Sequence, residues 1–314
     1  MTATQDTTPA VTTAPRWRMR YLFDRERSLG VAFLAPAVLY LILVVAYPLV
    51  LAFLYAFSNA TTGSQSLQFV GFATFSAAVH DPVFLTALTN TIIFTAISQA
   101  LVVLLSTVLA FVLTADFRGK WVVRLLILMP WTTPVALSAV VWLWMLDSIF
   151  SPFDWFAQLL GVVPPGGHIV FLGQSDLAMG SVIALQTWRI LPLATVIIMA
   201  GLSAIPADIK DAAEVDGAGF WRRLFGITLP LLTPVLMVAL LFGIVFTFTD
   251  MAVVYVLTGG GPGNATQVLA SWAFFKGVNG GDLSVGAADA LIMFPVLLVL
   301  AAVMLRVASR TEVN

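Results

Sequence analysis

Charged side chains are scarce in the long apolar runs of this chain, and those present are the first candidates for chemistry. Arg189, Asp250 and Asp289 each lie in a stretch that is otherwise almost wholly apolar. An ionisable group is costly to bury in hydrocarbon, so at membrane depth it usually marks a substrate site, an ion or proton path, or an internal ion pair. Each of the three is therefore a candidate site residue.

The surroundings of Asp250 and Arg189 suit a polyhydroxylated ligand. Helical spacing places three residues on the face of Asp250, namely Gly243, Phe246 and Thr247. A ring face, a hydroxyl and a carboxylate on one stripe complement the CH faces and hydroxyl groups of a sugar. On the other run, Arg189 shares a face with Leu193.

Structural roles compete with ligand binding at these positions. We expect Arg189 and Asp250 to hydrogen-bond a polyhydroxylated ligand and to pair with each other in its absence, but an ion pair that only holds two helices together is the alternative. A lone aromatic residue such as Phe246 more often packs within the protein than stacks on a ligand. The sequence leaves these alternatives open.

Other kinds of site lack the residues that they need. The chain has no cysteine, which excludes disulfides, thiol catalysis and cysteine metal sites. Its two histidines, His80 and His168, fall outside the apolar runs, so we expect no catalytic cluster and no metal site within them. Gly119-Lys120 is followed by Trp121 rather than Ser or Thr, which excludes a phosphate-binding loop.

The composition is that of a membrane protein. Apolar residues make up 60% of the 314 residues and charged residues only 10%, whereas a soluble domain carries about 25% charged residues. The net charge of -1 gives no reason to expect a nucleic-acid partner. We therefore expect an all-α membrane protein whose apolar surface is solvated by the lipid bilayer.

Six apolar runs are long enough to cross a bilayer, which takes about 20 residues. They lie near Gly30–Phe57, Leu85–Thr114, Val122–Leu146, Ala178–Ser203, Leu231–Leu257 and Val285–Val307. Several contain proline, which in membrane helices either shapes a cavity through a kink or is accommodated by ordinary packing. The sequence thus predicts six transmembrane helices.

The basic residues indicate orientation and domain limits. They cluster before the first run and after the second, fourth and sixth, as Arg16, Arg18, Arg20, Arg25, Arg27, Arg118, Lys120, Arg124, Lys210, Arg222, Arg223, Arg306 and Arg310. Since Lys and Arg favour the cytoplasmic side, we expect both termini to be cytoplasmic. Residues 1–29 are then a disordered basic N-terminus, residues 30–307 the membrane domain and residues 308–314 a tail.

The segment between the fourth and fifth runs, residues 205–230, has the pattern of a helical hairpin. A short helix is expected first, with Asp211 and another acidic residue near its N-terminus, where carboxylates interact favourably with the helix dipole. Gly217 permits a turn, and a second amphipathic helix is expected up to Pro230. Small residues flanked by charges suit insertion into a partner's cleft, although a helix resting on lipid is the alternative.

This segment resembles the coupling loop of binding-protein-dependent ABC importer permeases, whose pattern is Glu-Ala-Ala, Gly, nine residues, then Ile-x-Leu-Pro. The chain has Asp211-Ala212-Ala213, Gly217 and Ile227-Thr228-Leu229-Pro230 at that spacing, with Asp211 for the usual Glu. The resemblance extends over nearly the whole chain. Motifs similar to those of maltose/trehalose-type permeases are Leu34-Ala35-Pro36-Ala37, Tyr47-Pro48, Asn90-Thr91, Met129-Pro130 and Leu257-Thr258-Gly259-Gly260-Gly261-Pro262.

The resemblance implies the six-helix fold of type I ABC importer permeases and a transport subunit with no enzymatic activity or cofactor of its own. The implied partners are a second, related permease that completes a heterodimer, a cytoplasmic ATPase dimer that binds ATP and Mg, and an extracytoplasmic solute-binding protein that delivers sugar. By the same likeness, the residues that contact the ATPase are Asp211, Ala212, Ala213, Gly217 and Ala218.

The resemblance also implies which residues line the sugar path and where the protein resides. Mapped through Trp188-x-x-x-Pro192 and the glycine-rich motif, the lining positions of maltose-type permeases fall here on Arg189, Ile190, Leu193, Gly243, Phe246, Thr247 and Asp250. The Tyr and Asn familiar at such positions are absent, so the resemblance does not identify the sugar. It implies a multi-pass protein of a bacterial or archaeal cytoplasmic membrane.

Other transport functions compete with disaccharide import. An ABC importer of glycerol phosphate or amino acids is the nearest, although an anionic substrate calls for more cations than Arg189 alone. An ion-coupled secondary transporter requires broken helices in matching repeats, and the two halves of the sequence do not match.

Overall fold

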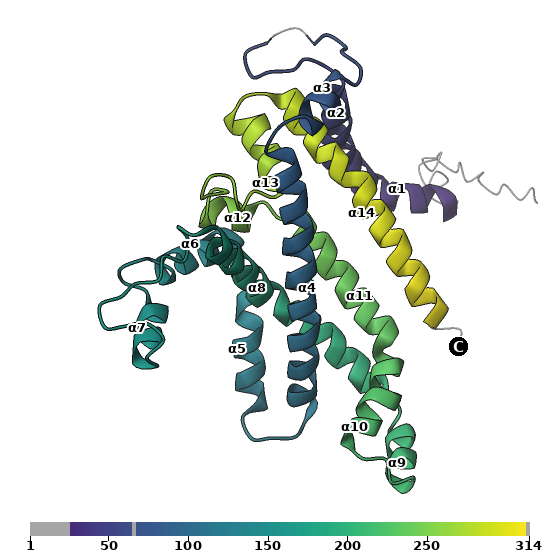
Figure 1. Ribbon diagram of the computed structural model, residues 1–314. Helices are drawn as coiled ribbons and strands as arrows, with labels where there is room; N and C mark the ends of the chain where they lie inside the picture. The colour runs from purple at the N-terminus through teal and green to yellow at the C-terminus, as the bar shows by residue number, and fades with distance from the viewer. Residues whose placement is uncertain (1–25, 65–66, 312–314) are drawn as a thin grey trace, which may run out of the picture. The chain divides into compact units, whose positions relative to one another are not determined.

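The computed structural model describes residues 26–64 and 67–311, and the ribbon is helical almost throughout (Figure 1). Apart from an isolated bridge between Ser58 and Phe69, the described residues form no β-structure. The chain divides into two compact units, residues 1–52 and 53–314, which we describe separately. Residues 1–25 of the predicted N-terminal segment 1–29 and residues 312–314 of the predicted tail 308–314 lie outside this description, and both domain limits stay predictions.

A continuous helical run begins in the first unit. It is built from α1 (Glu26–Leu41), the π-helical turn η2 (Ile42–Ala46) and α2 (Tyr47–Ala56). Its apolar part, Leu29–Ala56, is long enough to cross a membrane and has a mean hydropathy of 2.7. The π-helical turn lies just before Pro48, whose ring crowds the carbonyl four residues earlier and has no N–H to bond it. The wider turn, in which Tyr47 N–H donates to Ile42 O, relieves that conflict.

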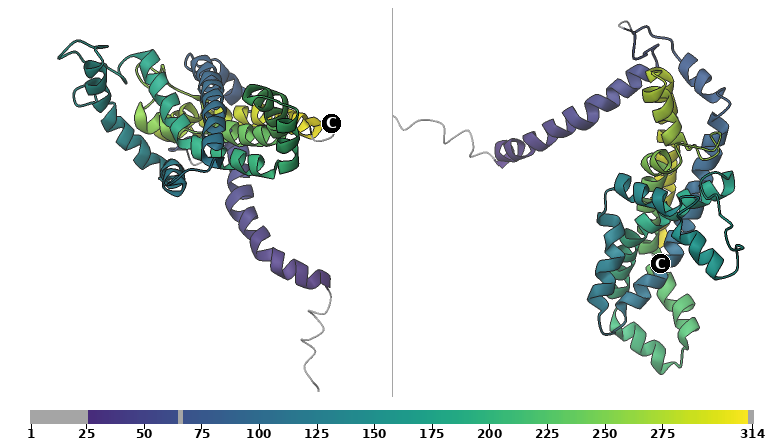
Figure 2. Two further views of the ribbon diagram at one scale, coloured as in Figure 1. Left: turned by 90° about the horizontal axis from the view of Figure 1, so that it is seen from below. Right: turned by 90° about the vertical axis from the view of Figure 1, so that its left-hand side faces the viewer.

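The second unit is a bundle of long helices with short ones between them. In chain order these are α3 (Ala73–Val79), α4 (Phe84–Thr114), α5 (Lys120–Thr132), α6 (Val135–Met145), α7 (Pro152–Leu159), α8 (Ser175–Ala204), α9 (Ala207–Val215), α10 (Phe220–Arg223), η3 (Leu224–Thr228), α11 (Leu229–Phe248), α12 (Ala252–Leu257), α13 (Leu269–Phe274), η4 (Phe275–Asn279) and α14 (Leu283–Thr311). α4 packs mainly against α8, and α11 contacts α4, α8 and α14 (Figures 1 and 2).

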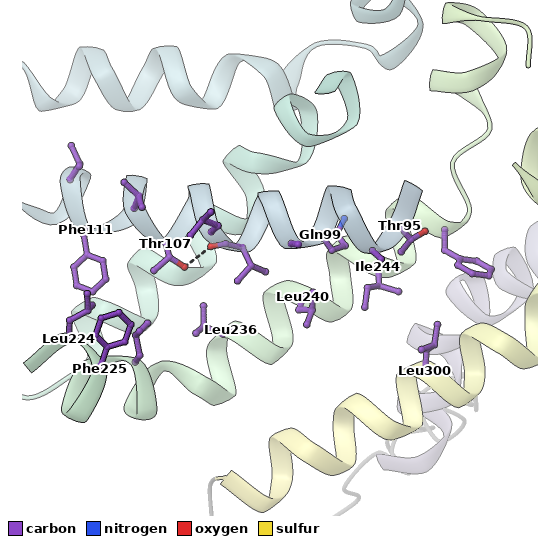
Figure 3. Close-up of a pocket in the computed structure, with 18 of the residues that line it drawn as sticks. Thr95, Gln99, Thr107, Phe111, Leu224, Phe225, Leu236, Leu240, Ile244 and Leu300 are labelled. Atoms are coloured by element: carbon purple, nitrogen blue, oxygen red, sulfur yellow. Dashed lines mark hydrogen bonds between the residues drawn. The ribbon is translucent and has the colours of Figure 1, made fainter. Parts of the chain in front are cut away.

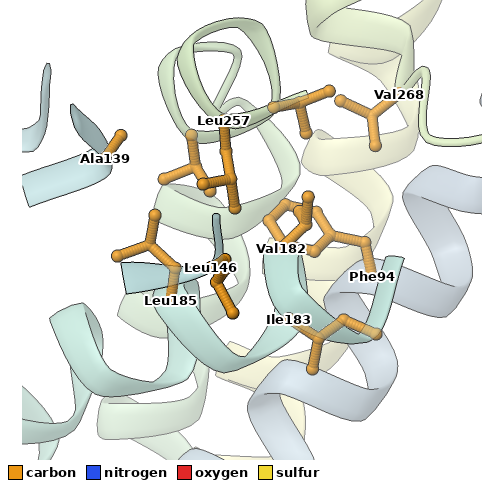
Figure 4. Packing of buried hydrophobic residues seen from close by; sticks show 10 residues of the cluster. Phe94, Ala139, Leu146, Val182, Ile183, Leu185, Leu257 and Val268 are labelled. Carbon is orange, nitrogen blue, oxygen red and sulfur yellow. The ribbon is translucent and has the colours of Figure 1, made fainter. Parts of the chain in front are cut away.

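Buried apolar clusters fill the spaces between these helices. In one of them Phe94 of α4, Val182 of α8 and Leu257 of α12 are almost fully buried (Figure 4). A second cluster joins the same long helices further along, through residues such as Val102 and Ile198. Because lipid tails are as apolar as these side chains, the clusters stabilise the bundle by close packing and dispersion rather than by removal from water.

The expected multi-pass helical membrane fold is confirmed, with a difference in two of the spans. In the described part of the chain, five helices are long and apolar enough to cross a membrane, and a sixth span results if α5 and α6 are counted together. α5 and α6 bend by 101° at their junction, since Pro134 forces Thr133 into an extended conformation. The run Leu231–Leu257 is likewise broken, between α11 and α12.

Two glycines bring η4 and α14 into backbone contact. A Cβ added to Gly286 would lie 2.5 Å from Gly277 Cα and 2.7 Å from Ala273 O. Small residues at helix crossings permit this close approach, which gains dispersion energy in lipid where the hydrophobic effect contributes little. Gly286 is therefore a packing residue of the second unit.

We predict that Gly286→Ala lowers the free energy of unfolding in mild detergent by about 1–3 kcal/mol, because the added methyl group overpacks a backbone contact that has no room to relax. The control is Gly180→Ala in α8, where no atom lies within 4 Å of the added Cβ. Denaturant-induced unfolding measures both variants. Equal losses for the two would contradict the packing role of Gly286.

Candidate functional site

The two helix breaks of the second unit lie next to each other. α12 packs against α6, and the rings of Trp131 in α5 and Phe246 in α11 meet edge to face with centroids 5.6 Å apart. Non-helical backbone at membrane depth is tolerated only where protein covers it or where it lines a water-filled cavity. The region where the breaks meet is therefore the candidate site.

An ion pair joins two elements of this region. Arg189 of α8 donates from Nη2 to Oδ2 of Asp250, which lies between α11 and α12. The two side chains are only 14% and 8% exposed. Asp250 Oδ1 accepts the Val253 N–H at 2.9 Å, so the same carboxylate caps α12. The pairing of these two residues, expected from the sequence, is observed.

Three buried polar side chains extend this ion pair into the bundle. Gln186 Oε1 accepts from Arg189 Nε at 3.2 Å and Nη2 at 2.8 Å, and Gln186 Nε2 donates to Thr247 Oγ1 at 3.0 Å. Gln99 Nε2 of α4 donates to the same hydroxyl at 2.7 Å. The network therefore ties α4, α8 and α11 together beside the α11–α12 break.

The other expected sugar-lining residues differ in their exposure. Phe246 is 40% exposed and presents a ring at the site, and Leu193 is half-buried one turn further along α8. Thr247 is fully buried and is occupied by the two glutamines. Gly243 is buried against Gln99, and Ile190 belongs to an apolar cluster. Phe246 thus keeps an exposed ring next to Trp131, whereas Thr247 is buried in the network behind the ion pair.

Gln99 and Gln186 are polar members of the site that the sequence reading did not identify. An available signal was the spacing of Gln186, which precedes Arg189 by three residues and so shares its helical face. No such signal existed for Gln99, because its partner Thr247 is 148 positions away in the chain.

A groove of about 1200 Å³ lies between α4, α11 and α14. Gln99 of the network forms part of its wall, but the rest of the lining is almost wholly apolar (Figure 3). Leu236, Leu240 and Leu300 are among the residues that face it, and Phe225 and Phe111 lie at its end. A sugar requires donors and acceptors along its length, so the groove suits lipid or an apolar helix rather than a polyol.

Asp289, the third ionisable residue expected at membrane depth, lies in a different cluster. It is fully buried in α14, and its charged neighbours are Asp81, Lys276 and Asp282. Lys276 pairs with Asp81 at 2.6 Å and lies over the ring of Trp272. These contacts do not include Arg189 or Asp250, so Asp289 is not part of the candidate site.

The predicted helical hairpin over residues 205–230 is present as α9, α10 and η3. α9 ends in a Schellman motif, in which Ala218 N–H donates to Ala213 O and Gly217 N–H to Glu214 O. Gly217 has φ +66°, the left-handed conformation that this motif requires and that glycine adopts most readily. Arg223 then pairs with Glu214 across the hairpin.

The hairpin lies at one end of the bundle, the same end as the α4–α5 connection (Figures 1 and 2). Asp211, Ala212 and Gly217 are exposed, Ala218 is half-buried, and Ala213 is buried behind them. Val215 is 88% exposed although it is apolar. The hairpin therefore presents a small-residue surface with an uncovered apolar side chain.

Two short motifs that are distant in the sequence meet at the opposite end of α4. Asn90 Nδ2 donates to Ala265 O and Gln267 O, at 2.8 and 2.9 Å. The next residue, Thr91, accepts the Leu269 N–H on its hydroxyl. The start of α4 thus holds the loop that follows the glycine-rich segment 259–263 in place.

Comparison with known proteins identifies the family. The model of the family described as "Binding-protein-dependent transport system inner membrane component" matches residues 103–313, which include α8, the hairpin and both helix breaks. The chain belongs to this family.

Two relatives are similar in sequence to this permease over most of its length. The sulfoquinovosyl glycerol transport system permease protein SmoG of Agrobacterium fabrum is 33% identical and covers 93% of this chain and 94% of its own. The trehalose/maltose transport system permease protein MalF of Thermococcus litoralis is 32% identical, and the match covers 90% of this chain and 94% of that protein. Both are transport subunits, which agrees with a membrane component that transports rather than catalyses.

A solved structure supports the fold of the permease. The crystal structure of a bacterial ABC transporter involved in the import of the acidic polysaccharide alginate matches with a TM-score of 0.79 and 19% identity. The match covers 93% of this permease and 99% of that chain. The permease therefore has the ABC importer permease fold and is a multi-pass membrane protein.

We predict that Arg189→Met lowers the free energy of unfolding by about 3–5 kcal/mol, because it leaves the Asp250 carboxylate buried without its cation. Asp250→Asn and the double variant complete a double-mutant cycle. The loss of unfolding free energy in the double variant should be smaller than the sum of the losses in the two single variants. The difference, which is the coupling energy of the pair, should be about 1–3 kcal/mol. Additive losses in detergent-solubilised protein would show that the contact contributes nothing to stability.

Proposed function

We propose that this permease forms half of the path of an ATP-driven importer for a disaccharide or oligosaccharide of the trehalose or maltose kind. The observation that carries the proposal is the Arg189–Asp250 pair at the α11–α12 break, with the exposed rings of Trp131 and Phe246 on the helices that end at the two breaks. Polar groups and aromatic rings inside an apolar bundle suit a ligand with many hydroxyl groups. The similarity to a trehalose/maltose permease supports this choice of substrate.

In the proposed site each residue meets a different part of the sugar. Arg189 donates to hydroxyl oxygens, and Asp250 accepts from hydroxyl groups, both with charge-assisted hydrogen bonds. Phe246, 40% exposed, offers a ring to a CH face of the sugar, and the half-buried Leu193 offers an apolar wall. Thr247, which is fully buried, supports the ion pair through Gln186 rather than touching the ligand.

The proposed importer needs other subunits. A second, related permease completes the path as a heterodimer partner, and an extracytoplasmic solute-binding protein delivers the sugar. A cytoplasmic ATPase dimer binds ATP and Mg and supplies the energy. The family name, which contains the words binding-protein-dependent, supports the second of these partners.

The hairpin is the proposed contact with the ATPase. Its exposed surface is formed by Asp211, Ala212, Gly217 and Ala218, and Ala213 is buried where the Schellman motif closes. It shares one end of the bundle with the α4–α5 connection, and both carry basic residues. This distribution supports an orientation with that end and both termini cytoplasmic, in a bacterial or archaeal inner membrane.

The proposed transport is tested in vesicles that contain the permease, its partner permease and the ATPase, with the binding protein outside. We expect uptake of trehalose or maltose that requires ATP. Arg189→Gln should reduce this uptake roughly 10- to 100-fold, because it removes charge-assisted hydrogen bonds worth about 1.5–3 kcal/mol. Arg118→Gln, at an exposed residue of the α4–α5 connection, should leave it unchanged. Uptake without ATP would disprove the proposal.

The coupling role is tested by Gly217→Ala in a pull-down of the ATPase. Alanine in the left-handed conformation costs about 1–2 kcal/mol, so capture of the ATPase should fall roughly 5- to 30-fold. The matched control is Gly219→Ala, where φ is -64° and ψ is 168°, a conformation that alanine adopts without strain. Equal capture by both variants would show that the hairpin does not hold the ATPase.

A further inference from the structure

We infer that Asp250 sets the charge preference of this site, by neutralising Arg189 so that the half-path formed by this permease accepts uncharged sugars and rejects anionic ones. The inference rests on the proposed function and adds a class of substrate to it. Acidic and neutral substrates both occur among the transporters that this permease is similar to, so the family by itself does not decide the question.

The contacts of the guanidinium leave one edge available to a ligand. Arg189 donates from Nε and Nη2 to Gln186 Oε1 and from Nη2 to Asp250. Within the described residues Nη1 donates to no acceptor, although an arginine carries two N–H groups there. A neutral hydroxyl can therefore accept from Nη1 without displacing the carboxylate.

The charges at the site cancel. Arg189 and Asp250 form a pair of opposite sign, and the residues that continue the network, Gln186, Thr247 and Gln99, are uncharged. Asp289, a further acidic residue within an apolar run, has Asp81, Lys276 and Asp282 as its charged neighbours instead. This half of the site therefore presents no net charge to a ligand.

An anionic sugar would meet two penalties at such a site. To reach Arg189 with a phosphate or sulfonate it must either displace Asp250 or place a second negative charge beside it. Like charges about 5 Å apart in a partly buried site repel each other strongly. We expect this repulsion to make the neutral ligand bind roughly 10- to 100-fold more tightly than the anionic one. A neutral sugar instead donates to the carboxylate and accepts from the guanidinium.

Gln186 acts as a positioning residue in this arrangement. It is fully buried, and its Oε1 accepts from two nitrogens of the guanidinium, which fixes the plane of that group on α8. Its Nε2 is held by Thr247, so the orientation of the amide is fixed in turn. The direction of the free Nη1 edge is thus determined by residues behind the site.

The test is equilibrium binding to the purified complex of both permeases and the ATPase, without the binding protein. Two matched ligand pairs serve as probes: trehalose with trehalose 6-phosphate, and maltose with its 6′-phosphate. The natural chain should prefer the neutral member at least 10-fold. Asp250→Asn, which leaves Arg189 uncompensated, should abolish or reverse that preference, and Asp250→Glu should retain it.

Further variants keep the test decisive if Asp250→Asn folds poorly. Arg189→Gln/Asp250→Asn has no net charge and should prefer the neutral ligand again, whereas Arg189→Gln alone should reject the anion more strongly. Asp147→Asn is the control for loss of a negative charge elsewhere. Asp147 is exposed, and hydrogen bonds from the Phe150 and Ile149 N–H groups hold its pKa below the usual value, so the control also removes a full charge.

The outcomes separate the inference from the proposed function. A natural chain that prefers the phosphorylated member, or a preference that is the same in all variants, would overturn the role of Asp250 and leave sugar import standing. If neither pair binds the natural complex, the proposed sugar site is wrong and the inference falls with it.

Discussion

Polar groups at membrane depth must find partners inside the protein, because hydrocarbon supplies neither donors nor acceptors. A helix satisfies its own backbone hydrogen-bonding groups. In the second unit of the permease, however, two apolar runs are interrupted, at the α5–α6 and α11–α12 junctions. Asp250 compensates at the second break by capping α12 while it pairs with Arg189. The same carboxylate thus stabilises the irregular backbone and forms the candidate site.

The buried network explains why the site and the helix bundle depend on each other. Thr247 accepts from Gln99 and Gln186, so α4, α8 and α11 share one hydroxyl immediately before α11 ends. A change in the position of any of these helices alters the hydrogen bonds that fix Arg189. In a dry interior an unsatisfied donor or acceptor is costly, so such a network favours a few discrete arrangements over a continuous range.

α11 also connects the site to the hairpin. Its 20 residues extend for about 30 Å from the π-helical turn η3 to Thr247 and Asp250. η3 precedes Pro230 as η2 precedes Pro48, and in both places the widened turn accommodates a proline ring. In the proposed importer, movement of the hairpin with the ATPase is therefore carried along a single helix to the residues that hold the sugar.

The sequence by itself determined the membrane class, the positions of the apolar runs, the hairpin over residues 205–230 and the two ionisable residues that pair at the candidate site. These follow from composition, from spacing along one chain and from the cost of charge in lipid, all of which are local properties. Only the tertiary structure decided that two runs are broken, that Gln99 and Gln186 extend the ion pair of the candidate site, and that Thr247 lies behind it. Those features depend on which helices pack together, and a residue such as Gln99 carries no local sign of a partner 148 positions away.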